Sequence, residues 1–133
     1  MKIINFVTLV LFTIFVLSYT TSIAQQKGGK IYWMSTVTVP LGKMQEYHSF
    51  AEKELIPAQV KAGYRYVAGW QTIVGEIEEV VVVAEFDNMD AYQKSRETLM
   101  ASPEWKSVGA NLAGLTRGVH TKMMIALPYI KMK

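Results

Sequence analysis

Apolar and polar positions along the chain follow two different periods, which predict strands and helices in turn. Residues 31–39 (IYWMSTVTV) are rich in β-branched and aromatic side chains and predict a strand. Over residues 43–62, apolar side chains recur at spacings of three and four, which predicts an amphipathic helix. Pro57 removes an internal hydrogen bond there and should kink or split the helix. We expect Gly63 to end it, because glycine readily adopts the left-handed backbone of a helix C-terminus.

A hairpin and a second helix are predicted next. Residues 64–74 and 79–86 each read as a strand, and the short turn between them predicts an antiparallel pair. Asp87 or Asn88 is expected to cap a helix over residues 89–100, because either side chain can accept a hydrogen bond from a free backbone N–H.

The last part of the chain adds a helix and a strand. Ser102 followed by Pro103 is typical of a helix start, and apolar residues from Trp105 to Leu115 continue at helical spacing. Residues 119–127 alternate and predict a final strand. The order β-α-β-β-α-β predicts an α+β domain with the ferredoxin-like arrangement, in which helices cover one face of a four-stranded sheet.

The predicted sheet is apolar on both faces. In the strand over residues 79–86, one face carries Val80, Val82, Ala84 and Phe86, and the other carries Val81 and Val83. Strands that are apolar on both sides are buried on both sides, and the helices supply only one covering layer. Leaving the second face in water would be unfavourable at about 25 cal/mol per Å² of apolar surface. We therefore expect a homodimer formed through the sheet face.

The N-terminus forms a separate segment. Residues 1–24 contain one charge and an apolar run over residues 3–17, and small residues precede the expected cleavage site before Gln25. About 20 apolar residues are usual for crossing a bilayer, so this run is short. We interpret residues 1–24 as a signal peptide, with an uncleaved anchor as the alternative. Residues 25–30 (QQKGGK) then form a flexible leader.

Composition narrows the class of protein. A chain of 133 residues corresponds to one domain, here residues 31–133 after the two N-terminal segments. The absence of cysteine excludes a disulfide scaffold, and a net charge of +3 is too small to indicate nucleic-acid binding. No second apolar run reaches membrane length, so after cleavage we expect an exported, periplasmic or secreted protein without a membrane segment.

Three stretches together resemble the NIPSNAP family: VPLGKMQEY after the first strand, GWQTIVGEIEEVVVVAEF across the hairpin, and SPEWKSV at the last helix start. The resemblance covers residues 31–128. It implies a dimeric α+β barrel, an architecture shared with the antibiotic-biosynthesis monooxygenases. It implies no particular reaction or catalytic set.

Aromatic residues are the main candidates for ligand binding. By alternation, Tyr64, Tyr66, Ala68 and Trp70 should share one face of their strand, and Trp33 can join them from the first strand. Such rings can line an apolar pocket with polar tips, which suits a flat or hydrophobic ligand. The alternative is an aromatic layer of the core or of the dimer interface.

His48 is the candidate catalytic residue. Its spacing from apolar helix positions places it near the inward face, where it could act as a base or bind haem iron; the alternative is a hydrogen-bonded histidine at the edge of the core. No histidine or acidic motif predicts a metal site, and we expect no cofactor. Three functions remain open: binding of a small hydrophobic or aromatic ligand, cofactor-free monooxygenation or isomerisation, and haem handling.

Overall fold

The computed structural model describes residues 29–130 and has the predicted ferredoxin-like α+β order. Its four strands pair in the order β2-β3-β1-β4, and every neighbouring pair is antiparallel. The strands are β1 (Ile31–Thr38), β2 (Arg65–Gln71), β3 (Glu79–Phe86) and β4 (Gly118–Ile125). The helical segments are η1 (Leu41–Lys43), α2 (Met44–Phe50), η2 (Ala51–Leu55), α3 (Ile56–Lys61), α4 (Met89–Ala101) and α5 (Trp105–Leu115).

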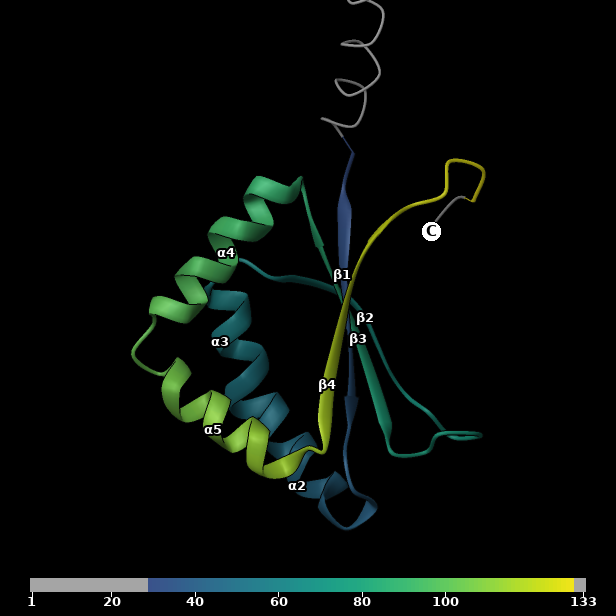
Figure 1. Ribbon diagram of the computed structural model, residues 1–133, viewed down its shortest axis with the longest axis vertical. Coiled ribbons are helices and arrows are strands. Elements are labelled where there is room, and N and C mark those ends of the chain that lie inside the picture. The colour runs from purple at the N-terminus through teal and green to yellow at the C-terminus, as the bar shows by residue number, and fades with distance from the viewer. Residues whose placement is uncertain (1–28, 131–133) are drawn as a thin grey trace, which may run out of the picture.

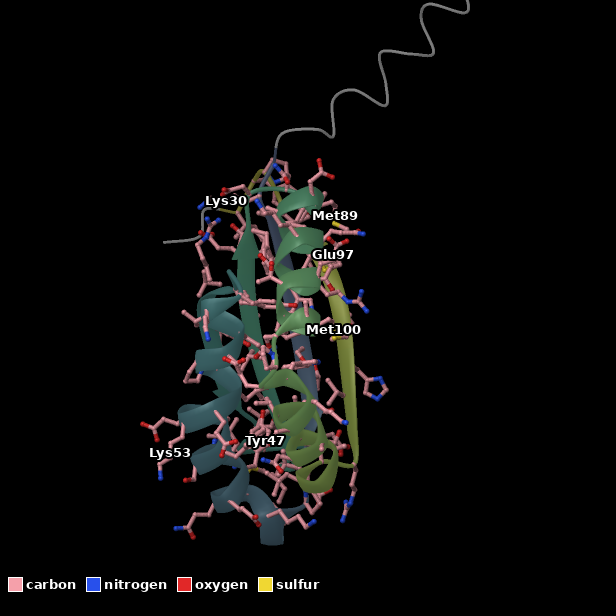
Figure 2. The ribbon with its side chains drawn as sticks, turned by 90° about the vertical axis from the view of Figure 1, so that its left-hand side faces the viewer. Lys30, Tyr47, Lys53, Met89, Glu97 and Met100 are labelled. Atoms are coloured by element: carbon pink, nitrogen blue, oxygen red, sulfur yellow. The ribbon has the colours of Figure 1, made fainter. Side chains whose placement is uncertain are left out.

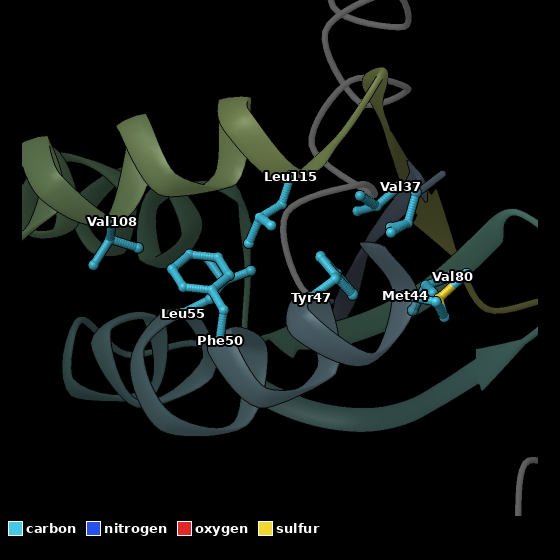
Figure 3. Packing of buried hydrophobic residues seen from close by; sticks show 9 residues of the cluster. Val37, Met44, Tyr47, Phe50, Leu55, Val80, Val108 and Leu115 are labelled. Carbon is cyan, nitrogen blue, oxygen red and sulfur yellow. The ribbon is translucent and has the colours of Figure 1, made fainter. Parts of the chain in front are cut away.

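All helices lie on one side of the sheet (Figure 1). Two groups of buried residues fill the space between the layers, and Trp105 packs against both. In the first group, Phe50 of α2 lies beside Leu55 and faces Leu115 of α5 (Figure 3). Burying a side chain of this size contributes about 1.5–3 kcal/mol. The packing of α2 against α5 therefore holds both helical segments over the same sheet face.

The first helical segment is divided close to Pro57, as its sequence predicts. Immediately before the proline, η2 is a π-helical turn, in which the backbone N–H of Ile56 donates to the carbonyl of Ala51. Proline has no N–H to donate, so the chain widens by one residue before the α-helix resumes in α3. The widened turn rotates the following residues and leaves Gln59 buried beneath α3, with only 6% of its surface exposed.

The predicted helix cap at Asn88 is confirmed. The Asn88 side chain caps α4 by accepting a hydrogen bond from the Ala91 N–H at 2.8 Å. Arg65 lies opposite Glu85 in the β2–β3 pair, with Nε 3.6 Å from the carboxylate, and it also pairs with Asp87 at 2.7 Å. These ion pairs lie at the surface and contribute little to stability, and both join Arg65 of β2 to the end of β3.

A β-bulge in β2 corrects one prediction. Tyr66 and Ala68 pair with consecutive residues of β3, so Val67 is an extra residue in its strand. An extra residue reverses the faces of the positions that follow it. Trp70 therefore pairs with Val81 and points to the outer face, away from the helices. The expectation that strict alternation keeps Ala68 and Trp70 on the face of Tyr66 is wrong.

The helices leave β4 largely uncovered. Val119 and Met123 lie on the helix side of the sheet, because they pair with the inward-facing Val37 and Trp33 of β1. They are nevertheless 42% and 39% exposed. Figure 2 shows β4 at the margin of the helical layer, with Met89 and Met100 on the side of α4 next to it. The helical layer therefore ends over β4 and leaves an opening there.

No helix within residues 29–130 has the length and hydropathy needed to cross a bilayer. The expected signal peptide (residues 1–24) and most of the expected leader lie outside the described residues.

Two glycines with positive φ provide a test of how the first helical segment packs on α4. Gly63 (φ 107°) ends α3, and a Cβ there would lie 2.6 Å from the Ser95 Oγ, whereas Gly75 (φ 98°) has no atom within 4 Å of such a Cβ. We expect Gly75→Ala to lower the free energy of unfolding by about 1–2 kcal/mol, the cost of a left-handed backbone for a residue with a Cβ. Gly63→Ala should lower the free energy of unfolding by more than Gly75→Ala does, because its Cβ would also clash with the Ser95 Oγ.

The losses in the free energy of unfolding for the two glycine variants are measured by urea denaturation followed by circular dichroism. In a Ser95→Ala background the Gly63→Ala cost should fall toward that of Gly75→Ala, because the clashing hydroxyl is gone. Equal costs for the two glycine variants in the wild-type background would contradict the packing described.

Candidate functional site

A cavity of about 460 Å³ lies between the sheet and the helices and reaches all four strands. Its floor comes from inward-facing strand residues, and its roof comes from both helical segments. The floor includes Trp33, Ser35, Val37, Tyr66, Gly69, Gln71, Val80, Val82, Val119 and Thr121. The roof and walls include Tyr47, His48, Ala51, Leu55, Ile56, Gln59, Tyr64, Tyr92, Arg96, Leu99, Met100, Trp105 and Leu112. The lining is mostly apolar with a few polar groups, which is typical of small-molecule sites.

Trp33, Tyr64 and Tyr92 form an aromatic wall of the cavity, and Phe86, outside the lining, links Tyr64 to Tyr92. Trp33 and Tyr64 meet edge to face with ring centroids 5.3 Å apart, Tyr64 meets Phe86 at 5.1 Å, and Phe86 meets Tyr92 at 5.3 Å. Such edge-to-face pairs add about 0.5–1.5 kcal/mol each beyond the burial of their surface. The wall is therefore held in place by its own contacts and presents a fixed apolar surface.

Tyr66 and Gln59 form the most buried polar contact of the site. The Tyr66 hydroxyl donates to the Gln59 Oε1 at 2.5 Å, which joins β2 to α3. Burial raises the pKa of Tyr66 well above its ordinary value, with smaller contributions from Tyr64 and Tyr47. The phenol therefore stays protonated and acts as a hydrogen-bond donor at neutral pH.

Tyr64 and Tyr47 are neutral for the same reason. Burial raises the pKa of Tyr64 to about 12; nearby Tyr92 adds to this rise, and the positive charge of Arg96 opposes it. Burial also raises the pKa of Tyr47. A phenol with a raised pKa is a poor proton acceptor near neutral pH, so these tyrosines do not supply a general base. They offer donors to an acceptor group on a bound molecule.

His48 lies at the margin of the cavity, and its side chain is exposed. Its Nε2 is 3.0 Å from the Oε1 of Gln71, which comes from the end of β2. Gln71 faces the helices only because the bulge in β2 reverses the strand at that point. Trp70 also lies at this margin, but its side chain is 59% exposed and borders a second, outer groove beside Val67.

Of the five residues expected to bind ligand, the structure therefore places Trp33, Tyr64 and Tyr66 in the cavity wall and floor, and His48 and Trp70 at its margin. Three polar residues of the lining, Ser35, Gln59 and Arg96, were not singled out from the sequence. Ser35 and Gln59 are buried polar residues that stand between apolar neighbours, on the inward face of β1 and along α3 respectively, and that contrast is the available signal. No set of three histidine or acidic side chains within residues 29–130 is arranged to hold a metal ion.

The Tyr66–Gln59 contact can be tested directly. We expect Tyr66→Phe to lower the free energy of unfolding by about 1–3 kcal/mol, because the buried Gln59 Oε1 loses its donor. Combining Tyr66→Phe with Gln59→Met, which removes the orphaned oxygen at similar length, should recover most of that loss. Denaturant titrations of the two single variants and the double variant measure the free energy of unfolding. If the loss in the double variant equals the sum of two large single losses, the contact does not have the proposed role.

The NIPSNAP family model matches residues 32–131 of this chain. Comparison of the sequence with curated proteins finds no match. Among solved structures, a NIPSNAP family protein of unknown function from Agrobacterium tumefaciens is 24% identical with a TM-score of 0.71, and the match covers 77% of this chain and 93% of that one. An uncharacterised NIPSNAP-like domain protein from Burkholderia xenovorans is 19% identical with the same TM-score and coverage of 78% and 90%.

A more distant likeness extends to an enzyme. SnoaB from Streptomyces nogalater, a cofactor-independent oxygenase, is 14% identical with a TM-score of 0.56, and the match covers 74% of this chain and 93% of that one. At this identity the likeness concerns the fold alone. The family match spans most of the chain and agrees with the strand order described above, so the chain belongs to the NIPSNAP family.

Proposed function

We propose that this protein is exported and binds a small hydrophobic or aromatic ligand in the cavity between sheet and helices. The cavity itself carries the proposal, because about 460 Å³ of space is lined mostly by rings and aliphatic side chains. An apolar molecule gains about 25 cal/mol per Å² of surface removed from water there. Export rests on the sequence of residues 1–24 alone.

Cofactor-free oxygenation or isomerisation is the second candidate. It is favoured by His48, because an imidazole at the cavity margin can take a proton from a bound substrate near neutral pH. SnoaB is a cofactor-independent oxygenase with a related fold, which is compatible with such chemistry but does not locate it in this chain. Haem handling is less favoured, because His48 Nε2 would have to give up its hydrogen bond to Gln71.

We also propose a homodimer formed through the outer face of the sheet. Helices cover the other face only (Figure 1), and the outer face presents the partly exposed Met34 and Val81 between its edges, beside the buried Val83. Large apolar side chains next to this face are strongly exposed: Val67, Trp70, Ile73, Val74, Ile77, Leu127, Tyr129 and Ile130. An apolar surface of this kind is typical of a protein interface.

Ligand binding is tested with a neutral aromatic probe, naphthalene-2-carboxamide, by isothermal titration calorimetry. We expect binding to the wild-type protein and a loss of at least tenfold, about 1.4 kcal/mol, in a Val82→Phe variant, because the larger ring occupies the cavity. The same substitution at Val60, which is 52% exposed on α3 and outside the cavity lining, is the matched control. Equal binding by the two variants would place the probe elsewhere, and consumption of the probe would favour the enzymatic candidate.

The dimer is tested by sedimentation at micromolar concentration. The wild-type protein should sediment as a dimer, and Val81→Lys should sediment as a monomer, because it introduces a charge at the centre of the outer face. Val60→Lys, on the helix side, should leave the dimer intact. Circular dichroism confirms that both variants fold, and a monomeric wild-type protein would refute the interface.

A further inference from the structure

We propose that the ligand of this cavity is an apolar carboxylate, a molecule with an aromatic or similarly rigid body whose anionic group binds the guanidinium of Arg96. The inference rests on the ligand-binding function proposed above and specifies the class of molecule. Its basis is the placement of Arg96 at the opening of the cavity beside β4.

Arg96 stands on the cavity side of α4. Tyr92, Arg96 and Met100 are spaced by four residues, which places them on one side of the helix, and all three line the cavity. Val119 and Thr121, on the uncovered helix side of β4, line the same cavity. Arg96 is an exposed residue that also lines the cavity, so it lies where the cavity meets solvent, and the buried Trp33 and Tyr64 lie further inside.

The charges of the cavity favour an anion. Its lining contains no aspartate or glutamate, and Arg96 is its one arginine or lysine. Within residues 29–130, five ion pairs engage Lys30, Lys61, Arg65 and Arg117 with carboxylates, and Arg96 belongs to none of them. A cation beside a low-dielectric apolar space and without a fixed counter-charge produces a positive potential that an incoming anion can neutralise.

Arg96 also acts on the interior of the site. Burial raises the pKa of the Tyr64 hydroxyl, and the Arg96 charge opposes that rise, so its field reaches the aromatic wall. A guanidinium presents two parallel N–H donors that match the oxygens of a carboxylate. A ligand with its rings against Tyr64 and Trp33 and its carboxylate at the opening would satisfy both parts of the site.

The test compares two probes that share one ring system, naphthalene-2-carboxylate and naphthalene-2-carboxamide, by isothermal titration calorimetry. The wild-type protein should bind the carboxylate at least tenfold more tightly than the amide. Arg96→Gln should remove this preference while leaving the amide affinity within twofold of wild type, because the apolar wall is unchanged. Arg96→Lys, which keeps the charge but not the paired donors, should restore part of the preference.

Lys94→Gln is the matched control, because it removes one positive charge from the same helix at a position outside the cavity lining. It should retain the full preference for the carboxylate. Equal affinities for the two probes in the wild-type protein, or a preference that survives Arg96→Gln, would overturn the assignment of Arg96 while the ligand-binding function stands. Failure of both probes to bind would overturn both proposals.

Discussion

The structure depends on how two helical segments cover four strands from one side. Phe50 of α2 and Leu115 of α5 belong to one buried cluster, and their packing holds α2 and α5 over β1 and β3. Protein interiors pack densely, so space remains only where the helical layer diverges from the sheet or ends. The cavity lies beneath that layer, and its opening beside Val119 lies where the layer stops short of β4.

The polar groups of the cavity sit where the regular elements are interrupted. The π-helical turn before Pro57 leaves Gln59 buried beneath α3, where it receives the Tyr66 hydroxyl. The bulge at Val67 turns Gln71 inward, where it meets His48. Both interruptions cost regular hydrogen bonding, and both place a side-chain amide at the cavity. Bulges and π-turns are frequent next to functional sites for this reason.

Much of the fold follows from the sequence, because period, caps and breakers act locally. The span of β3, the Asn88 cap and the division near Pro57 each depend on a few neighbouring residues. The bulge could not be predicted by alternation, which assumes that every residue has a partner. The exposure of β4 could not be predicted either, because a strand's apolar period shows which face is sheltered but not how far the sheltering helices extend. The role of Arg96 could not be predicted from the sequence, because an arginine on an amphipathic helix is ordinarily a solvated residue.

The site is asymmetric from one margin to the other, and this limits what it can bind and do. At the β2 margin, His48 is hydrogen-bonded to Gln71. At the β4 margin, Arg96 has no carboxylate partner within the cavity lining. Between the two margins Tyr64 and Tyr66 are held neutral by their raised pKa values, so they offer hydroxyl groups and no negative charge. The site therefore combines hydroxyl groups with a positive charge and has no aspartate or glutamate in its lining. This combination favours a ligand that has an apolar body and hydrogen-bond acceptors of its own. Any proton transfer would have to involve His48, at the margin opposite the charge that orients the ligand.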